Sequence, residues 1–71
     1  MRKTVIVQKM REKRKLTQEA LSARSGVKQQ TISAIESGKN KNPRIDTLYL
    51  LARALHCTVD DLIEEENTKG A

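Results

Sequence analysis

The stretch from residue 17 to residue 38, TQEALSARSGVKQQTISAIESG, constrains the fold more than any other part of the chain. It predicts two short helices joined by a tight turn at Gly26, because glycine adopts the positive φ that a sharp turn after a helix requires. Thr17 is a favourable N-cap for the first helix, and Glu19 in its first turn suits the helix dipole. The second helix is expected to stop at Gly38. The chain therefore changes direction within three or four residues, and the two helices form a corner.

The second helix of this corner, expected at about residues 29–37, has an apolar side and a polar side. Ile32 and Ile35 are expected to face the inside of the corner, together with Leu21 and Val27. The outer side presents Gln29, Gln30, Ser33 and Ser37, with Ala34 beside them and Thr31 near the edge. An uncharged face of hydrogen-bonding groups suits the reading of base edges in a DNA groove. For a single exposed glutamine an ordinary polar surface is the commoner explanation, so the spacing of the whole corner carries this interpretation.

The rest of the chain predicts three more helices, which makes the expected fold an all-α, compact five-helix globule. A first helix is expected from a cap at Thr4 to about Arg14, with a short strand at residues 4–7 as the alternative because β-branched residues cluster there. Thr58 and Asp61 resemble a capping box that starts a short fifth helix. A fourth helix, at about residues 46–55, has an apolar stripe formed by Ile45, Leu48, Leu51, Ala52 and Leu55. Residues expected to face inward from the fifth helix are Val59, Leu62 and Ile63.

A length of 71 residues allows one domain, which we expect at residues 1–66, with residues 67–71 as a short flexible C-terminal tail. The chain has no Trp or Phe and one Tyr, so its core must be aliphatic. The single cysteine, Cys57, excludes an internal disulfide and indicates a reducing compartment. No apolar run is long enough for a signal peptide or a membrane span. We therefore expect a cytoplasmic protein, associated with the nucleoid.

The net charge of +5 is unevenly distributed, since residues 1–44 carry +9 and residues 45–71 carry −4. The basic half suits a polyanion, because neutralising phosphates releases counterions, although a solvated charged surface is the alternative. A glutamine amide offers a donor and an acceptor that match N6 and N7 of adenine, which makes Gln29 and Gln30, with Ser33 and Ala34, the candidate base-reading residues. Candidate phosphate-binding residues around them are Gln18, Lys28, Thr31, Ser37, Lys39, Asn40, Lys41, Asn42 and Arg44.

The pattern L-T-Q-E-x-L-S-x-x-S-G-V-x-x-x-T-I-S-x-I-E-S-G-K resembles the lambdoid phage repressor and Cro-like helix-turn-helix family, also called the XRE type. The similarity extends from about residue 5 to residue 63. It implies a lambda repressor-like domain that binds double-stranded DNA, usually as a homodimer, with its third helix in the major groove.

This resemblance also implies roles for individual residues. Gln18 occupies the position of a glutamine that bonds a phosphate and braces a base-reading glutamine, while Gln29 and Gln30 match the first two readers. Ala34 stands where a third polar reader is common and offers only a methyl contact, for example to a thymine methyl group. Arg11 and Glu36 match an ion pair that tethers the first helix to the third.

Three departures from the family pattern concern the backbone. Lys28 replaces the usual Ser or Thr cap of the third helix. Lys15 lies where Gly or Asn is common, a site of mild backbone strain. His56 lies at a helix C-terminus where relatives have Gly, and its expected role is capping rather than catalysis.

The function implied by these observations is sequence-specific regulation of transcription, with repression by promoter occlusion as the simplest mechanism. An antitoxin or another protein-interaction module that also binds DNA is the alternative, disfavoured by the few residues after Ile63. RNA binding is disfavoured by the lack of aromatic residues on the basic face. No catalytic set, metal-ligand set or cofactor motif is recognisable, so we expect no enzyme, no cofactor, no metal and no small-molecule ligand. Tyr49, Leu50 and Ile63 are the candidate dimer contact.

Overall fold

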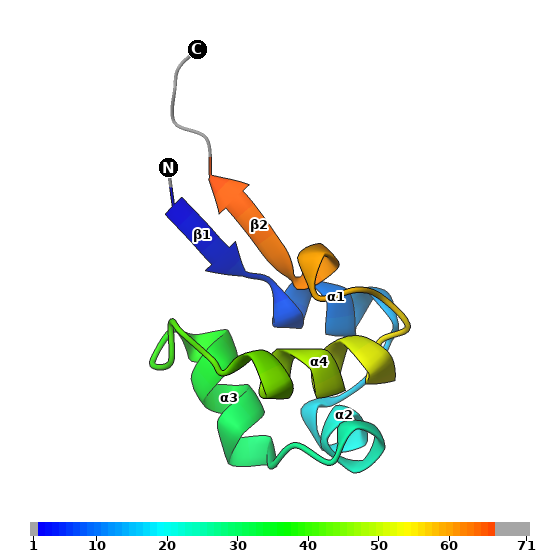
Figure 1. The fold of residues 1–71 in the computed structure, drawn as a ribbon. Coiled ribbons are helices and arrows are strands. Elements are labelled where there is room, and N and C mark those ends of the chain that lie inside the picture. The colour runs from blue at the N-terminus through cyan, green and yellow to red at the C-terminus, as the bar shows by residue number, and fades with distance from the viewer. Residues whose placement is uncertain (1, 67–71) are drawn as a thin grey trace.

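The computed structural model describes residues 2–66 of the chain, and the side chains of residues 5–64. Within this range four α-helices pack together, and a two-stranded antiparallel ribbon extends from them (Figure 1). The elements in chain order are β1 (Arg2–Val5), α1 (Val7–Lys13), α2 (Gln18–Ser25), α3 (Gln29–Ser37), α4 (Ile45–Ala54), the 3-10 helix η1 (Asp60–Leu62) and β2 (Ile63–Glu66). The predicted tail at residues 67–71 lies outside the described residues. The helices among residues 2–66 are all too short and too polar to traverse a bilayer.

The prediction of five helices is wrong, because the described chain has four α-helices and the short η1. At the N-terminus the helix capped by Thr4 does not form. The chain runs as β1 instead, and α1 begins at Val7 after an N-cap, Ile6, whose side chain makes no capping hydrogen bond. The strand considered as the alternative is therefore closer to the structure, although it is displaced toward the N-terminus.

The ribbon forms because β1 finds a partner at the other end of the chain. In the antiparallel register Arg2 lies opposite Glu66, and Val5 lies opposite Ile63. The β-branched residues Thr4 and Val5 favour an extended backbone once such a partner is present. The acidic residues 64–66 belong to β2, the other strand of this ribbon.

The core is aliphatic, as the composition predicts, and lies where the four helices meet. Helix α4 packs against α2, and α1 packs against α3. The buried apolar residues are Val7, Leu21, Val27, Ile32, Ile35, Leu48, Leu51, Ala52, Leu55 and Leu62. One predicted member of the α4 stripe does not belong to it, since Ile45 is 69% exposed. Ile45 is the first residue of α4 and follows an exposed loop, so no earlier helical turn covers its side chain.

The predicted capping box at residues 58–61 forms but supports only a single turn of 3-10 helix. The Thr58 amide donates to Asp61 Oδ2, and the Asp61 amide donates to Thr58 Oγ1, both at 3.1 Å. These hydrogen bonds from Thr58 hold the pKa of the Asp61 carboxyl below its ordinary value. The chain leaves the helical conformation at Ile63 because it enters β2 there.

Candidate nucleic-acid interface

The corner between α2 and α3 is fixed by a small set of hydrogen bonds around Gly26. The Thr17 side chain caps α2 by accepting from the Ala20 amide at 3.0 Å, as expected. Gly26 ends α2 with a φ of 80°, and a Cβ there would meet no atom within 4 Å. The positive φ alone therefore favours glycine. The Ser22 hydroxyl then donates to the Val27 carbonyl at 2.6 Å, which closes the turn.

The outer face of α3 borders a shallow depression on the protein surface. Its lining consists of Gln18, Gln29, Gln30, Ser33, Ala34, Ser37 and Lys39. All four predicted base-reading residues are in this set, together with three of the predicted phosphate-binding residues. Gln29, Gln30 and Ser33 are exposed, and Ala34 is half-buried. The amide-rich face thus points outward while Ile32 and Ile35 of the same helix are buried.

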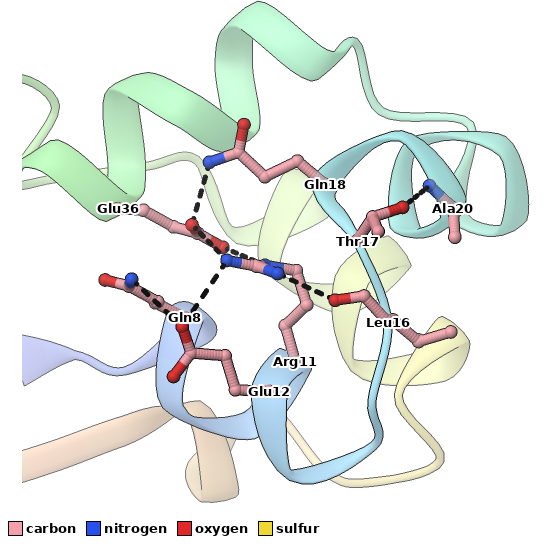
Figure 2. Close-up of polar contacts among 8 residues, drawn as sticks. All are labelled: Gln8, Arg11, Glu12, Leu16, Thr17, Gln18, Ala20 and Glu36. Atoms are coloured by element: carbon pink, nitrogen blue, oxygen red, sulfur yellow. Dashed lines mark hydrogen bonds and ion pairs between the residues drawn. The ribbon is translucent and has the colours of Figure 1, made fainter.

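An ion pair joins Arg11 of α1 to Glu36 of α3, next to Ser37 of this face (Figure 2). Arg11 Nε donates to Glu36 Oε2 at 2.8 Å, and Arg11 Nη2 donates to Glu36 Oε1 at 3.0 Å. Arg11 Nη1 also donates to the Leu16 carbonyl at 2.7 Å. The two side chains are only 12% and 5% exposed. The hydrogen bond to Glu36 raises the pKa of Arg11. The predicted ion pair that tethers α1 to α3 is present.

Gln18 joins this network, a contact that the sequence pattern did not reveal. Its Nε2 donates to Glu36 Oε1 at 2.8 Å. A carboxylate only accepts hydrogen bonds, so the amide nitrogen of Gln18 must face Glu36. The amide oxygen then points away from Glu36 (Figure 2). One N–H and the carbonyl oxygen remain for a ligand, and the predicted phosphate contact of Gln18 stays a prediction.

The segment between α3 and α4 carries most of the remaining phosphate candidates. Its backbone is held by local bonds: the Asn40 amide donates to the Ala34 carbonyl at 2.9 Å, and the Asn42 amide donates to Asn40 Oδ1 at 3.0 Å. Lys39, Lys41, Asn42 and Arg44 are exposed there, and Asn40 is half-buried. Apart from Lys39, these residues do not line the depression on α3. The exposed residues of this segment form a basic edge beside the depression on α3.

The other two phosphate candidates flank the start of α3. Lys28 precedes α3 as its N-cap and is exposed, and its side chain makes no capping hydrogen bond, as its replacement of Ser or Thr predicts. Thr31 is half-buried. Neither residue lines the depression.

The backbone strain that the sequence predicts at Lys15 is present there and also at His56, for which only a capping role was expected. Lys15 and His56 have φ values of 60° and 56°, in the left-handed region that favours glycine. Arg14 lies next to Lys15 in sequence, and its Nη2 donates to the His56 carbonyl at 3.4 Å.

Cys57 is half-buried, and burial raises the pKa of its thiol.

The candidate dimer residues occupy two different environments. Tyr49 and Leu50 lie on the outer side of α4 and are 55% and 40% exposed. Ile63 is the first residue of β2, half-buried and packed against the core. Ile63 therefore has a structural role of its own, whereas the Tyr49–Leu50 pair is free of the core.

Comparison with known proteins agrees with this geometry. A family model described as "Helix-turn-helix" matches residues 7–62. An uncharacterised HTH-type transcriptional regulator, y4dJ of Sinorhizobium fredii, is 44% identical over 55 residues, which cover 78% of this chain and 70% of the relative. A second uncharacterised HTH-type regulator, from Archaeoglobus fulgidus, is 36% identical over 63 residues, covering 84% of this chain and 87% of the relative. A third uncharacterised HTH-type regulator, YozG of Bacillus subtilis, is 36% identical over 55 residues, which cover 78% of this chain and 66% of the relative.

The match spans the four α-helices and η1, and it includes the corner whose Gly26 turn, buried isoleucines and outward amides have been described. The chain therefore belongs to the helix-turn-helix family of the Cro/C1, or XRE, type, as its sequence pattern predicts.

Proposed function

We propose that this protein is a sequence-specific regulator of transcription that binds duplex DNA as a homodimer and inserts α3 into the major groove. The observation that carries the proposal is the outer face of α3, where the exposed amides of Gln29 and Gln30 border a depression together with the cation of Lys39. Relatives named as HTH-type transcriptional regulators support the same function.

The geometry divides the work between two groups of residues. Gln29 and Gln30 lie in the first turn of α3, the end of a recognition helix that meets base edges in this docking mode. Ser33 and Ala34, one turn later, lie on the same depression, and the Ala34 methyl suits a thymine methyl group. Lys39 and Lys41 are exposed on the following segment, where they suit phosphates on either side of the groove.

The reading face is the outer side of α3, with Gln29, Gln30, Ser33 and Ala34. The ion pair between α1 and α3 gives this face a rigid support. Arg11 and Glu36 connect α3 to α1, and Glu36 also orients the amide of Gln18 at the edge of the depression. A helix held in this way presents its side chains at low entropic cost on binding. Repression by occlusion of a promoter is the simplest regulatory outcome for a domain that only has to occupy its site.

Selection of bound sites from random duplex DNA tests this proposal. We expect enrichment of a palindrome whose half-sites are about 34 Å apart, because a two-fold dimer places its recognition helices one helical turn apart. Gln29→Ala and Gln30→Ala should each change the enriched sequence, whereas Gln8→Ala, on the exposed side of α1, should not. Equal recovery of all sequences by the unmodified protein would contradict sequence-specific binding.

A further inference from the structure

The outer side of α4 carries four exposed residues at the spacing of one helical face. Asp46, Tyr49, Leu50 and Arg53 follow one another at i, i+3, i+4 and i+7, and all four are exposed. The apolar pair lies at the centre, an acid lies at the N-terminal end and a cation lies at the C-terminal end. None of these residues lines the depression on α3, so this α4 face and the reading face can be occupied at the same time.

This face is complementary to itself when two copies of α4 lie antiparallel. The midpoint of the four residues falls between Tyr49 and Leu50, and Asp46 and Arg53 each lie about 5 Å from it along the helix axis at 1.5 Å per residue. A two-fold axis through that midpoint brings Asp46 of one copy to Arg53 of the other, and does so twice. The same operation places Tyr49 against Leu50 of the second copy, so opposite charges and apolar groups all find partners.

A parallel arrangement of the two helices lacks this property. It would place Asp46 beside Asp46 and Arg53 beside Arg53, and like charges in contact are destabilising. The charge order along the α4 face therefore selects the antiparallel pairing.

The contacts made within one chain leave the face ready for such a partner. The Arg53 guanidinium lies 5.9 Å from the ring centroid of Tyr49, a cation–π contact that holds the charge close to the apolar centre. Asp46 pairs with Arg44 at 3.4 Å, but the two side chains are 65% and 84% exposed. Such an exposed pair is weak and exchanges readily. Tyr and Arg are also the residue types that are enriched at the centres of interfaces.

We propose that the α4 face, defined by Asp46, Tyr49, Leu50 and Arg53, is the site at which a second copy of this chain docks antiparallel. The proposal rests on the proposed function, which requires two copies on a palindrome. A single four-residue helix face is far smaller than the roughly 800 Å² per partner of a standard stable interface. The free protein is therefore monomeric when dilute, and two adjacent half-sites supply the effective concentration that brings the faces together.

Charge exchange across the interface tests this assignment. Asp46→Arg and Arg53→Asp should each lower the affinity for the selected palindrome by about tenfold, because two pairs change from attraction to repulsion. The combined variant Asp46→Arg/Arg53→Asp should recover the wild-type affinity. Asp60→Arg and Lys13→Asp make the same charge changes at exposed positions outside α4, and they control for the general effect of charge on DNA binding.

Each variant is measured by gel shift on the palindrome and on a duplex with one half-site, and by sedimentation of the concentrated protein without DNA. Single α4 variants should match their charge controls on the half-site and lose cooperativity only on the palindrome. Circular dichroism shows whether each charge variant is folded. If one is unfolded, Leu50→Lys takes its place, because Leu50 lies outside the core and the buried lysine charge should cause the same loss of cooperativity. Retained cooperativity in the single variants, or no recovery in a folded double variant, would overturn the proposal.

The sedimentation arm separates failure of this proposal from failure of the proposed function. If the wild-type protein binds no duplex selectively, the regulatory function is wrong, yet the charge-exchange pattern in self-association still decides the role of the α4 face. If the protein binds DNA selectively but only as independent single copies, sequence-specific DNA binding holds, whereas the homodimer and the α4 interface are both refuted.

Discussion

Replacing Arg11 with methionine removes the cation from the ion pair between α1 and α3 and leaves the carboxylate of Glu36 largely enclosed. Glu36 is 5% exposed, and it loses two hydrogen bonds of 2.8 and 3.0 Å while keeping only the one from Gln18. Breaking one partner of a buried pair costs about 3–5 kcal/mol. Because Arg11 itself is 12% exposed and water can reach the vacated space, we expect the lower end of that range, about 3 kcal/mol.

A loss of stability of this size is measurable in a small domain. At roughly 0.05–0.15 kcal/mol per residue, a chain of this length unfolds with about 4–11 kcal/mol, so Arg11→Met remains folded but with a much lower urea midpoint. The double variant Arg11→Met/Glu36→Met replaces both charges by apolar groups and should be more stable than Arg11→Met alone. Urea unfolding followed by far-UV circular dichroism gives all these free energies on one scale.

The control is a pair of the same charges on the surface. Arg44 and Asp46 are 84% and 65% exposed, so Arg44→Met should cost no more than about 1 kcal/mol. If Arg11→Met is no more destabilising than Arg44→Met, or if the double variant is less stable than Arg11→Met, then burial of the Glu36 charge is not what makes the pair important.

Four further variants address the reading face, the basic edge, the backbone and the capping box. Gln29→Ala should cost about 1–3 kcal/mol in binding and relax the preference at one base pair, and equal weakening on every sequence would contradict a base contact. Lys41→Ala should weaken binding uniformly and reduce the salt slope by about 1, while an unchanged slope would remove Lys41 from the phosphate contacts. His56→Gly should raise the free energy of unfolding by about 1 kcal/mol because it relieves a φ of 56°, and destabilisation would show that the His56 side chain makes a favourable contact of greater value. The pKa of Asp61 is lowered on folding, so the Asp61 carboxylate stabilises the fold above its unfolded pKa of about 3.8, and this stabilisation is lost as the pH falls through the folded pKa. Asp61→Asn should therefore flatten the acid-unfolding curve in this pH range. An unchanged curve would exclude the linkage.

The corner and its outward face are predictable from sequence because their signals are local. Thr17 caps within three residues, and Gly26 and Gly38 each impose a positive φ on the spot. Once the two turns are fixed, the 3.6-residue period decides which side of α3 is buried. The pairing of Arg11 with Glu36 came from the family resemblance rather than from local signals, since the two residues are far apart in sequence.

The ends of the domain escaped prediction because their structure depends on partners far along the chain. Thr4 reads equally well as a helix cap or as a strand residue, and only pairing of β1 with β2 decides the choice. Ile45 fits the apolar stripe of α4 by its spacing, but its position at the first turn leaves it exposed. The contact of Gln18 with Glu36 likewise depends on how α2 and α3 are placed in space, which sequence spacing does not specify.

The antiparallel ribbon has a consequence for how the protein is made. Arg2 pairs with Glu66, so the strand β1 pairs with a strand that is synthesised only after all four helices (Figure 1). During synthesis β1 has no partner until residues 63–66 emerge, whereas α1 to α4 already contain the residues that pack against each other. The helical body can therefore assemble ahead of the ribbon, and β1 keeps an unpaired strand edge until residues 63–66 have been synthesised.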